Sequence, residues 1–128
     1  MELTIYFDDV NKILVTNPIG EVTTENVKET IKQALAISKE HNCEFLLFDT
    51  RKCYLGQSLI EGFEAMSKIG ESIGMSPKYK CAIVYNPVNY PEERAKFIEN
   101  VVTNRLSNAF KFFTNLEEAI LWLEKFRK

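Results

Sequence analysis

Two kinds of apolar pattern alternate along the chain. Short apolar runs rich in β-branched and aromatic residues occupy 2–9, 11–18, 44–49, 79–86 and 110–113. Runs of this length, bounded by polar and turn-forming residues, predict β-strands. The runs at 44–49 and 79–86 are continuously apolar, which is typical of strands that are buried on both faces of a sheet.

Between these runs, apolar residues recur at spacings of three and four, the pattern of amphipathic helices. The segments expected to be helical run from Thr24 to the pair His41-Asn42, from Ser58 to Ile73, from Pro91 to Leu106, and from Asn115 to Phe126. The last of these begins with a capping box, because Glu118 follows Asn115 at a spacing of three. It places Leu116, Ala119, Ile120, Leu123 and Phe126 on its buried stripe, with Trp122 beside it.

The resulting order is β-β-α-β-α-β-α-β-α. Strands that alternate with crossover helices predict an α/β fold with a mixed, mostly parallel five-stranded sheet and four helices covering both faces. A turn-like segment at 8–12 predicts a hairpin, which makes the first strand an antiparallel edge. No internal repeat or linker divides the chain, so residues 1–128 are expected to form a single domain.

Composition narrows the class of protein. The chain has 128 residues, a formal net charge of −2, 45% apolar and 27% charged residues. It lacks the basic surplus typical of nucleic-acid binders. No window reaches the ~18 apolar residues of a membrane-spanning helix. The acidic start MELTIYFDD has no signal-peptide pattern, so we expect a cytoplasmic protein.

Cysteine usage gives no sign of a bound metal. The three cysteines, Cys43, Cys53 and Cys81, have spacings that match no zinc-binding pattern. Free, buried thiols are the ordinary interpretation of such residues in a reducing compartment. We therefore expect neither a metal nor another cofactor.

The topology predicts where a binding site would lie. In open α/β sheets, ligands gather beyond the carboxyl ends of the parallel strands. The polar and apolar side chains expected at this rim, as an interaction or ligand surface, are Asp49, Arg51, Tyr54, Leu55, Ser58, Asn86 and Tyr90.

Catalytic patterns are absent from the sequence. The single histidine, His41, falls at a helix C-terminus, where it caps carbonyl groups and complements the helix dipole. No nucleophile–base pair, metal-ligand set or phosphate-binding glycine loop can be assembled from the residues at the rim. We therefore expect a protein that is not an enzyme.

Ser58 has two interpretations. The segment SLIE at 58–61 forms a capping box, in which the Ser58 hydroxyl accepts a hydrogen bond from the amide of residue 61. A phosphate on Ser58 would also be stabilised there, because a helix N-terminus offers free amides and a favourable dipole. Arg51 and Lys52 would offset the like charge of Asp49.

The order and spacing of three segments resemble a known family. These segments are GEVTTENV (20–27), FLLFDTRK (45–52) and KFFTNLEEAILWL (111–123). Together they resemble the STAS domain of bacterial anti-sigma-factor antagonists and, more closely, the SpoIIAA-like family of small stand-alone proteins. The resemblance implies a regulatory domain without enzymatic activity, which binds a partner or a ligand near the start of its second helix.

The sequence departs from the antagonists at their phosphorylation motif. It reads DTRKCYLGQS where they carry Asp-Ser-Ser-Gly. Ser58 is the nearest positional equivalent of the serine that is phosphorylated in the antagonists, but the motif around it does not match. The apolar residues in this loop suggest an alternative function, because SpoIIAA-like domains resemble the lipid-binding CRAL-TRIO fold. An apolar ligand pocket would then be lined by Tyr54, Leu55, Leu59, Phe63, Tyr90 and Phe97. The same loop could instead cover a homodimer interface, and Phe63 and Phe97 could simply fill the core.

Overall fold

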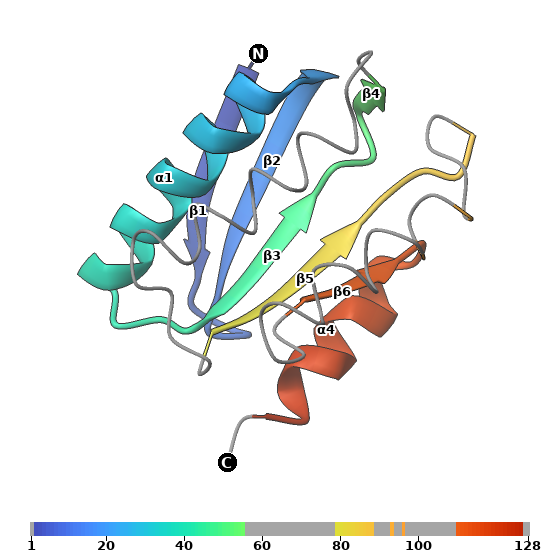
Figure 1. Ribbon diagram of the computed structural model, residues 1–128. Coiled ribbons are helices and arrows are strands. Elements are labelled where there is room, and N and C mark those ends of the chain that lie inside the picture. Colours follow the sequence, from blue (N-terminus) through green and yellow to red (C-terminus); the bar gives the residue numbers. More distant parts are fainter. Residues whose placement is uncertain (1, 56–78, 89–92, 94–95, 97–109, 127–128) are drawn as a thin grey trace.

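A six-stranded sheet with two helices makes up the described part of the chain (Figure 1). The computed structural model describes residues 2–55, 79–88, 93, 96 and 110–126. The strands are β1 (Glu2–Asp8), β2 (Ile13–Val22), β3 (Phe45–Asp49), β4 (Cys53–Leu55), β5 (Lys80–Val84) and β6 (Phe110–Phe113). The helices are α1 (Thr24–Glu40) and α4 (Leu116–Glu124). No helix in these ranges is long and apolar enough to cross a membrane.

The sheet is mixed, with strand order β1-β2-β3-β5-β6 and with β4 paired to β2. β1 forms an antiparallel hairpin with β2, whereas β2–β3, β3–β5 and β5–β6 are parallel pairs. The predicted antiparallel edge strand and the parallel centre of the sheet are therefore confirmed. The predicted helix at 58–73 lies outside the described residues, and of the predicted helix at 91–106 only Glu93 and Lys96 are described, both as helical.

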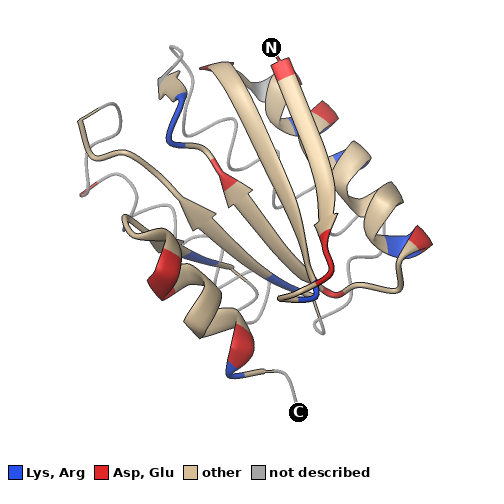
Figure 2. Cartoon of the chain, turned by 180° about the vertical axis from the view of Figure 1, so that it is seen from behind, with Lys and Arg blue, Asp and Glu red and all other residues tan. Residues whose placement is uncertain are grey.

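Each face of the sheet packs against one of the two helices. On one face, Ile31, Ala34 and Leu35 of α1 join a cluster that includes Leu14 and Leu46. On the other face, Ala119 and Leu123 of α4 pack with buried residues of β2, β3 and β5. The two views show α1 in front of the sheet in Figure 1 and α4 in front of it in Figure 2. Strands β3 and β5 are buried on both faces, as their continuous apolar runs predicted.

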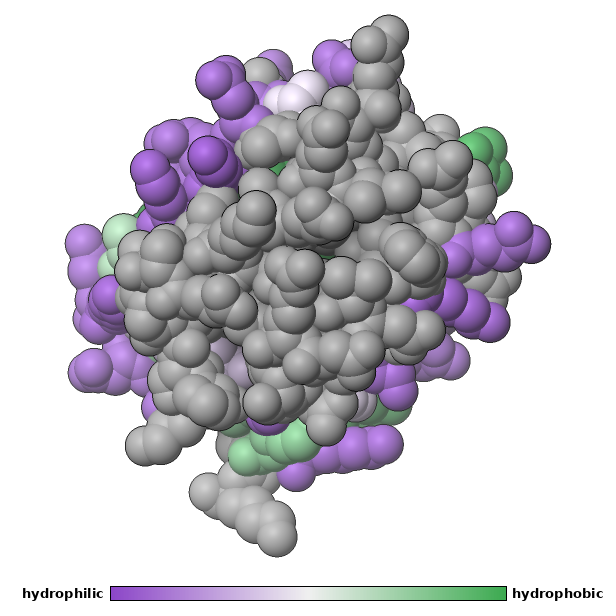
Figure 3. Space-filling model, in the orientation of Figure 1, coloured by the Kyte–Doolittle hydropathy of each residue, from purple (hydrophilic) through white to green (hydrophobic). Residues whose placement is uncertain are grey.

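Local signals set both ends of α1. The Thr23 side chain accepts a hydrogen bond from the Asn26 amide at 3.1 Å and caps the N-terminus. His41 is the C-cap, and its ring stacks on Phe7 with the ring centroids 4.7 Å apart. Asn42 follows with a φ of 52°, a left-handed conformation that asparagine tolerates and that ends the helix. The helix presents a hydrophilic outer side (Figure 3).

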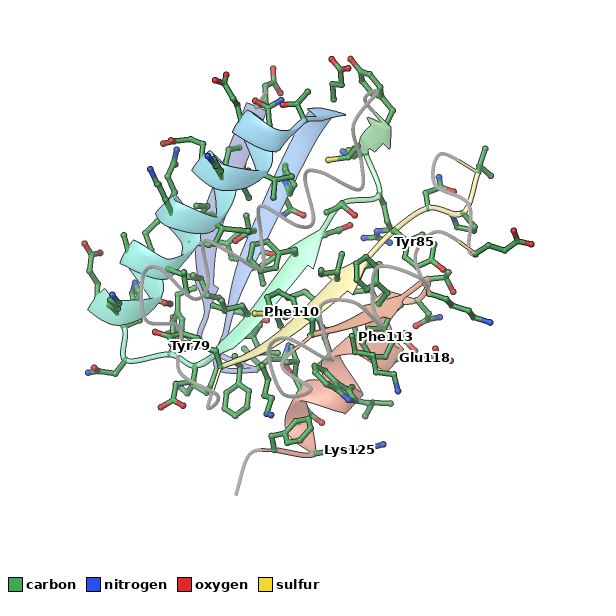
Figure 4. All side chains as sticks on the ribbon, viewed as in Figure 1. Tyr79, Tyr85, Phe110, Phe113, Glu118 and Lys125 are labelled. Carbon is green, nitrogen blue, oxygen red and sulfur yellow. The ribbon has the colours of Figure 1, made fainter. Side chains whose placement is uncertain are left out.

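The far end of α1 is tied to the start of β5. The Ser38 hydroxyl is fully buried, donates to the Leu35 carbonyl and lies 3.4 Å from the Tyr79 hydroxyl. Figure 4 shows Tyr79 beside this end of the helix. A buried serine on the apolar stripe of α1 therefore has its polar group satisfied.

α4 begins as its capping box predicted. The Asn115 side chain accepts a hydrogen bond from the Glu118 amide at 3.1 Å. Phe126, however, is wrongly predicted as a buried stripe residue, because the helix ends at Glu124 and Phe126 is exposed. Its ring instead packs edge-on against Trp122, which also contacts Phe113 of β6.

Two segments outside the predicted strands, 19–22 and 53–55, are strand in the structure. Because the second of them is a separate strand, the predicted count of five strands is wrong. β2 does not end at Pro18 but continues to Val22, and Cys53–Leu55 forms β4 against this extension. A three-residue strand has too few positions to show a periodic pattern. Its formation depends on a partner far away in the sequence, which the local pattern could not reveal.

All three thiols are free and buried, as predicted. Burial raises the pKa of Cys53 to about 11, although a backbone hydrogen bond from Gly20 favours its thiolate. Burial also raises the pKa of Cys81. Cys53 and Cys81 are therefore protonated and shielded at neutral pH, which suppresses their nucleophilicity.

We expect the native protein to react slowly with a thiol reagent at pH 8. For Cys53, the raised pKa alone cuts the thiolate population by about a hundredfold relative to an unfolded cysteine. Labelling with 5,5′-dithiobis(2-nitrobenzoate), followed by peptide mass mapping, measures each site. The same reagent in 6 M guanidinium chloride is the control, in which all three cysteines should react within seconds. Rapid labelling of Cys53 in the native protein would contradict the burial of its thiol.

Candidate functional site

A split in the sheet creates the candidate site. β2 pairs with β3 through Leu14–Thr16 and then with β4 through Gly20–Val22. Between these two pairings, residues 17–19 of β2 separate from the chain that connects β3 to β4. The view from behind shows β4 set apart from the main sheet at the end of β3 (Figure 2).

Pro18 and Cys53 fit the chemistry of this split. A proline has no amide hydrogen, so Pro18 leaves no donor unpaired where β2 has lost its β3 partner. The Pro18 carbonyl accepts a hydrogen bond from the Cys53 thiol at 3.3 Å. Gly20, the first β2 residue that pairs with β4, has a φ of 131°, which favours glycine. These residues redirect β2 from one partner to the next.

The split opens into a pocket of about 590 Å³. Its lining comes from β1, from the middle of β2 and from the segment that follows β3. The lining residues are Thr4, Asn17, Pro18, Ile19, Asp49, Arg51 and Lys52. Thr4 and Asn17 are register partners in the β1–β2 hairpin, which brings them together from two different strands.

Asp49 and Arg51 form the charged centre of the pocket. The Arg51 Nε donates to Asp49 Oδ1 at 2.8 Å, and Nη2 donates to Oδ2 at 2.7 Å. The tight turn after β3 makes this geometry available, because the Cys53 amide donates to the Thr50 carbonyl at 3.0 Å. Thr50 also donates from both its amide and its hydroxyl to the Val84 carbonyl, which ties the turn to the end of β5.

The electrostatics of the pair follow from its partial exposure. Burial alone would raise the pKa of Asp49, but the hydrogen bonds and charge of Arg51 outweigh it and hold this pKa below 3.8. The side chain of Arg51 is 45% exposed and that of Asp49 is 16% exposed. Solvent therefore screens the pair, and we expect it to contribute at most about 1 kcal/mol to stability. Its main role is to fix the direction of the guanidinium.

Removing Arg51 is expected to reverse the shift of the Asp49 pKa. In the Arg51→Ala variant, burial remains while the main opposing interaction is lost, so the pKa should rise from below 3.8 to above it. The side-chain ¹³C chemical shift of Asp49, followed by NMR against pH, measures this change. In the native protein, the stabilisation by this pair is present above pH 3.8 and lost as the pH falls through the folded-state pKa.

Lys32→Ala, an exposed change on α1, is the control and should leave the Asp49 titration unaltered. An unchanged Asp49 pKa in Arg51→Ala would mean that the pair does not form in solution.

The structure brings together part of the predicted rim. Asp49 and Arg51 line the pocket, and Tyr54 follows on β4 with 55% of its surface exposed. Asn86 lies beyond the end of β5, where its side-chain oxygen accepts a hydrogen bond from the Val88 amide, and it does not line the pocket. Leu55 is the last residue of β4. Ser58 and Tyr90 lie outside the described residues.

Sequence reasoning missed Thr4 and Ile19 as site residues. Thr4 stands on the first strand, where the sequence predicts no rim position, and Ile19 comes directly after the predicted end of the second strand at Pro18. The alternation of β1 together with the register of its hairpin would have placed Thr4 opposite Asn17. The signal was therefore present but required the register of the turn.

The predicted capping role of His41 is confirmed. It caps the C-terminus of α1 and stacks on Phe7, and it does not line the pocket. Within the described ranges, no group of three or more His, Cys, Asp or Glu side chains could hold a metal ion. The residues that line the pocket supply hydrogen-bonding groups and charges, and Arg51 is held in a fixed orientation. Such groups are suited to binding a ligand or partner.

The order of the strands and the helices on the two faces define a class of fold, and comparison with solved structures identifies it as SpoIIAA-like. A similar structure is that of an uncharacterized protein of the DUF3478 family from Shewanella loihica PV-4, which is described as having a SpoIIAA-like fold. The match has a TM-score of 0.57 and 18% sequence identity, and it covers 95% of this chain and 92% of the other. No family model and no curated protein matches the chain. The resemblance in fold predicted from the sequence is confirmed.

Proposed function

We propose that the chain is a STAS-like regulatory domain that acts by contact with a partner protein and is not an enzyme. Its contact surface would consist of Asp49, Arg51, Tyr54 and Asn86, at the carboxyl ends of β3 and β5. The observation that carries this proposal is the exposed Tyr54, three residues after an arginine that two hydrogen bonds hold in place.

Tyrosine and arginine are the side chains that most often dominate the energy of protein interfaces. Both residues here stand on backbone that is fixed by pairing with β2 or by the turn after β3. A side chain that is already oriented loses less conformational entropy when a partner binds. The SpoIIAA-like fold supports the proposal, since the STAS domains it resembles act through protein contact.

The alternative of an apolar-ligand carrier has less support from the described residues. Five of the seven described residues that line the pocket are polar or charged, and Pro18 and Ile19 are the apolar ones. Tyr54 and Leu55 suggested a lid because they were taken for apolar loop residues, but they belong to a strand. Leu59, Phe63, Tyr90 and Phe97, the other residues of the predicted apolar pocket, lie outside the described residues.

A site-specific crosslinking experiment tests the contact surface. p-Benzoylphenylalanine replaces Tyr54 in cells of the source organism, and irradiation should yield one defined protein adduct. The matched control places the same group at Val10, which is 88% exposed in the β1–β2 turn and should yield none. Arg51→Glu should reduce the Tyr54 adduct at least about tenfold, because it removes the oriented guanidinium and reverses the charge within the proposed contact surface. Lys32→Glu should leave it unchanged.

Equal adducts from both positions, or an adduct that Arg51→Glu does not reduce, would refute the proposed surface.

Ser58 enters this proposal as the phosphoacceptor that would regulate contact. A phosphate on Ser58, which follows Arg51 by seven residues in the sequence, would add negative charge and change partner affinity. Mass spectrometry of the denatured protein, isolated from its own cells with phosphatase inhibitors, should show a phosphate-sized increment that maps to Ser58. Its absence under conditions in which the partner is both bound and released would exclude this regulation.

A further inference from the structure

We propose that the pocket at the strand split binds a small organic anion, a phosphorylated or carboxylated metabolite with a hydroxyl-bearing body. This inference goes beyond protein contact and does not depend on it. The described lining of the pocket comes from β1, β2 and the turn after β3, all within this one chain.

The charged lining favours an anion. It holds one carboxylate, from Asp49, against two cations, from Arg51 and Lys52. Both Asp49 oxygens already accept hydrogen bonds from Arg51, so this pair is close to neutral toward a ligand. The charge that remains is that of Lys52, whose ammonium group interacts with Asp49 through charge but makes no hydrogen bond within the described ranges. An incoming anion would supply one.

Hydrogen-bond donors also remain on Arg51. Its guanidinium has five N–H groups, and the contacts with Asp49 engage Nε and Nη2. The donors that are left keep a fixed direction, because a bidentate pair locks the plane of the group. A phosphate or carboxylate placed between Arg51 and Lys52 would therefore meet donors that are already oriented.

The uncharged lining favours a ligand that is larger than a simple ion. Thr4 and Asn17 stand opposite each other on β1 and β2. The hydroxyl of Thr4 and the side-chain amide of Asn17 can each donate hydrogen bonds to, and accept them from, hydroxyl groups of a ligand. Pro18 and Ile19 supply apolar surface next to them. The volume of about 590 Å³ lies within the range of about 300–1,000 Å³ that is typical of small-molecule sites.

NMR titration of the purified ¹⁵N-labelled protein tests the proposal. The probes are glucose 6-phosphate, gluconate and glucose, each added at constant ionic strength. We expect saturable shifts of the Thr4, Asn17, Ile19, Arg51 and Lys52 amides with at least one of the two anions. Which anion saturates distinguishes a phosphate ligand from a carboxylate ligand. Glucose, which has the body without the charge, should bind at least about tenfold more weakly.

Two variants separate this site from general attraction to surface cations. Lys52→Gln and Arg51→Gln should each weaken anion binding about tenfold, whereas Lys32→Gln on α1 should not change it. The thermal unfolding of each variant shows that the fold is retained.

Shifts that stay linear with concentration for both anions, that spread over exposed lysines, or that survive both pocket variants would overturn the proposal. So would equal binding of glucose. Because the assay contains no other protein, failure here leaves partner contact unaffected, and failure of the crosslinking test leaves this site unaffected.

Discussion

Replacing Leu123 with alanine is expected to lower the free energy of unfolding by about 3 kcal/mol, within the ~2–5 kcal/mol typical of fully buried leucines. Leu123 is completely buried between α4 and the sheet, where it packs with Ala119 and with buried residues of β3 and β5. The substitution removes apolar contacts and leaves a cavity that a close-packed core fills poorly. Urea unfolding followed by circular dichroism measures the change.

The same helix offers a matched control. Leu121 lies two residues earlier and is 59% exposed, so Leu121→Ala should change the free energy of unfolding by less than about 0.5 kcal/mol. The chemistry of the two substitutions is identical, and only the burial of the side chain differs. Equal effects would mean that α4 does not pack on the sheet through the face that contains Leu123.

Replacing Gly20 with alanine is expected to cost about 1–3 kcal/mol and to release β4 from β2. Gly20 has a φ of 131°, a conformation that a Cβ atom disfavours. It pairs with Cys53, and its backbone hydrogen bond to the Cys53 thiol would be disturbed with it. We therefore expect Cys53 to react with thiol reagents much faster in this variant than in the native protein.

Glu21→Ala is the neighbouring control. Glu21 is exposed on the same strand, and its replacement should leave both stability and the reactivity of Cys53 nearly unchanged. Labelling of Cys81, at the centre of the sheet, reports whether Gly20→Ala disturbs β4 alone or the whole fold. An unaltered Cys53 reaction rate together with unaltered stability would contradict the conformation of Gly20.

The elements that the sequence predicted well are those with local signals. α1 carries its own start and stop, in Thr23 and in the pair His41-Asn42, and both lie where the pattern indicated. β6 occupies the four residues of the FKFF run. Continuous apolar runs identified β3 and β5, because strands buried on both faces need no polar alternation.

The parts that were predicted wrongly depend on partners far apart in the sequence. Pro18 was taken for the end of a strand, but the split removes the neighbour that would have required its amide. β4 forms because β2 extends past β3, and neither segment shows this by itself. The spacing of apolar residues places Phe126 on the buried stripe of the last helix, but α4 ends two residues before it.

The candidate site was predictable in its location but not in its composition. Topology placed Asp49 and Arg51 at the carboxyl end of a parallel strand, and both line the pocket. Topology did not reveal that a strand split would recruit Thr4 and Ile19 from the edge hairpin. The hydrogen bonds between Asp49 and Arg51 depend on a turn geometry that residue types alone do not specify.

The acidic residues at the two ends of β1 oppose aggregation through the edge of the sheet. β1 is the edge strand of the described sheet, and such edges are templates on which a second molecule can add a strand. Two β1 strands that met antiparallel about Ile5 would set Glu2 of each molecule against Asp8 of the other. Like charges directly opposite each other destabilise a strand pair. Fibril growth from this edge in that register would thus be opposed at both ends of the strand, and most strongly at low salt.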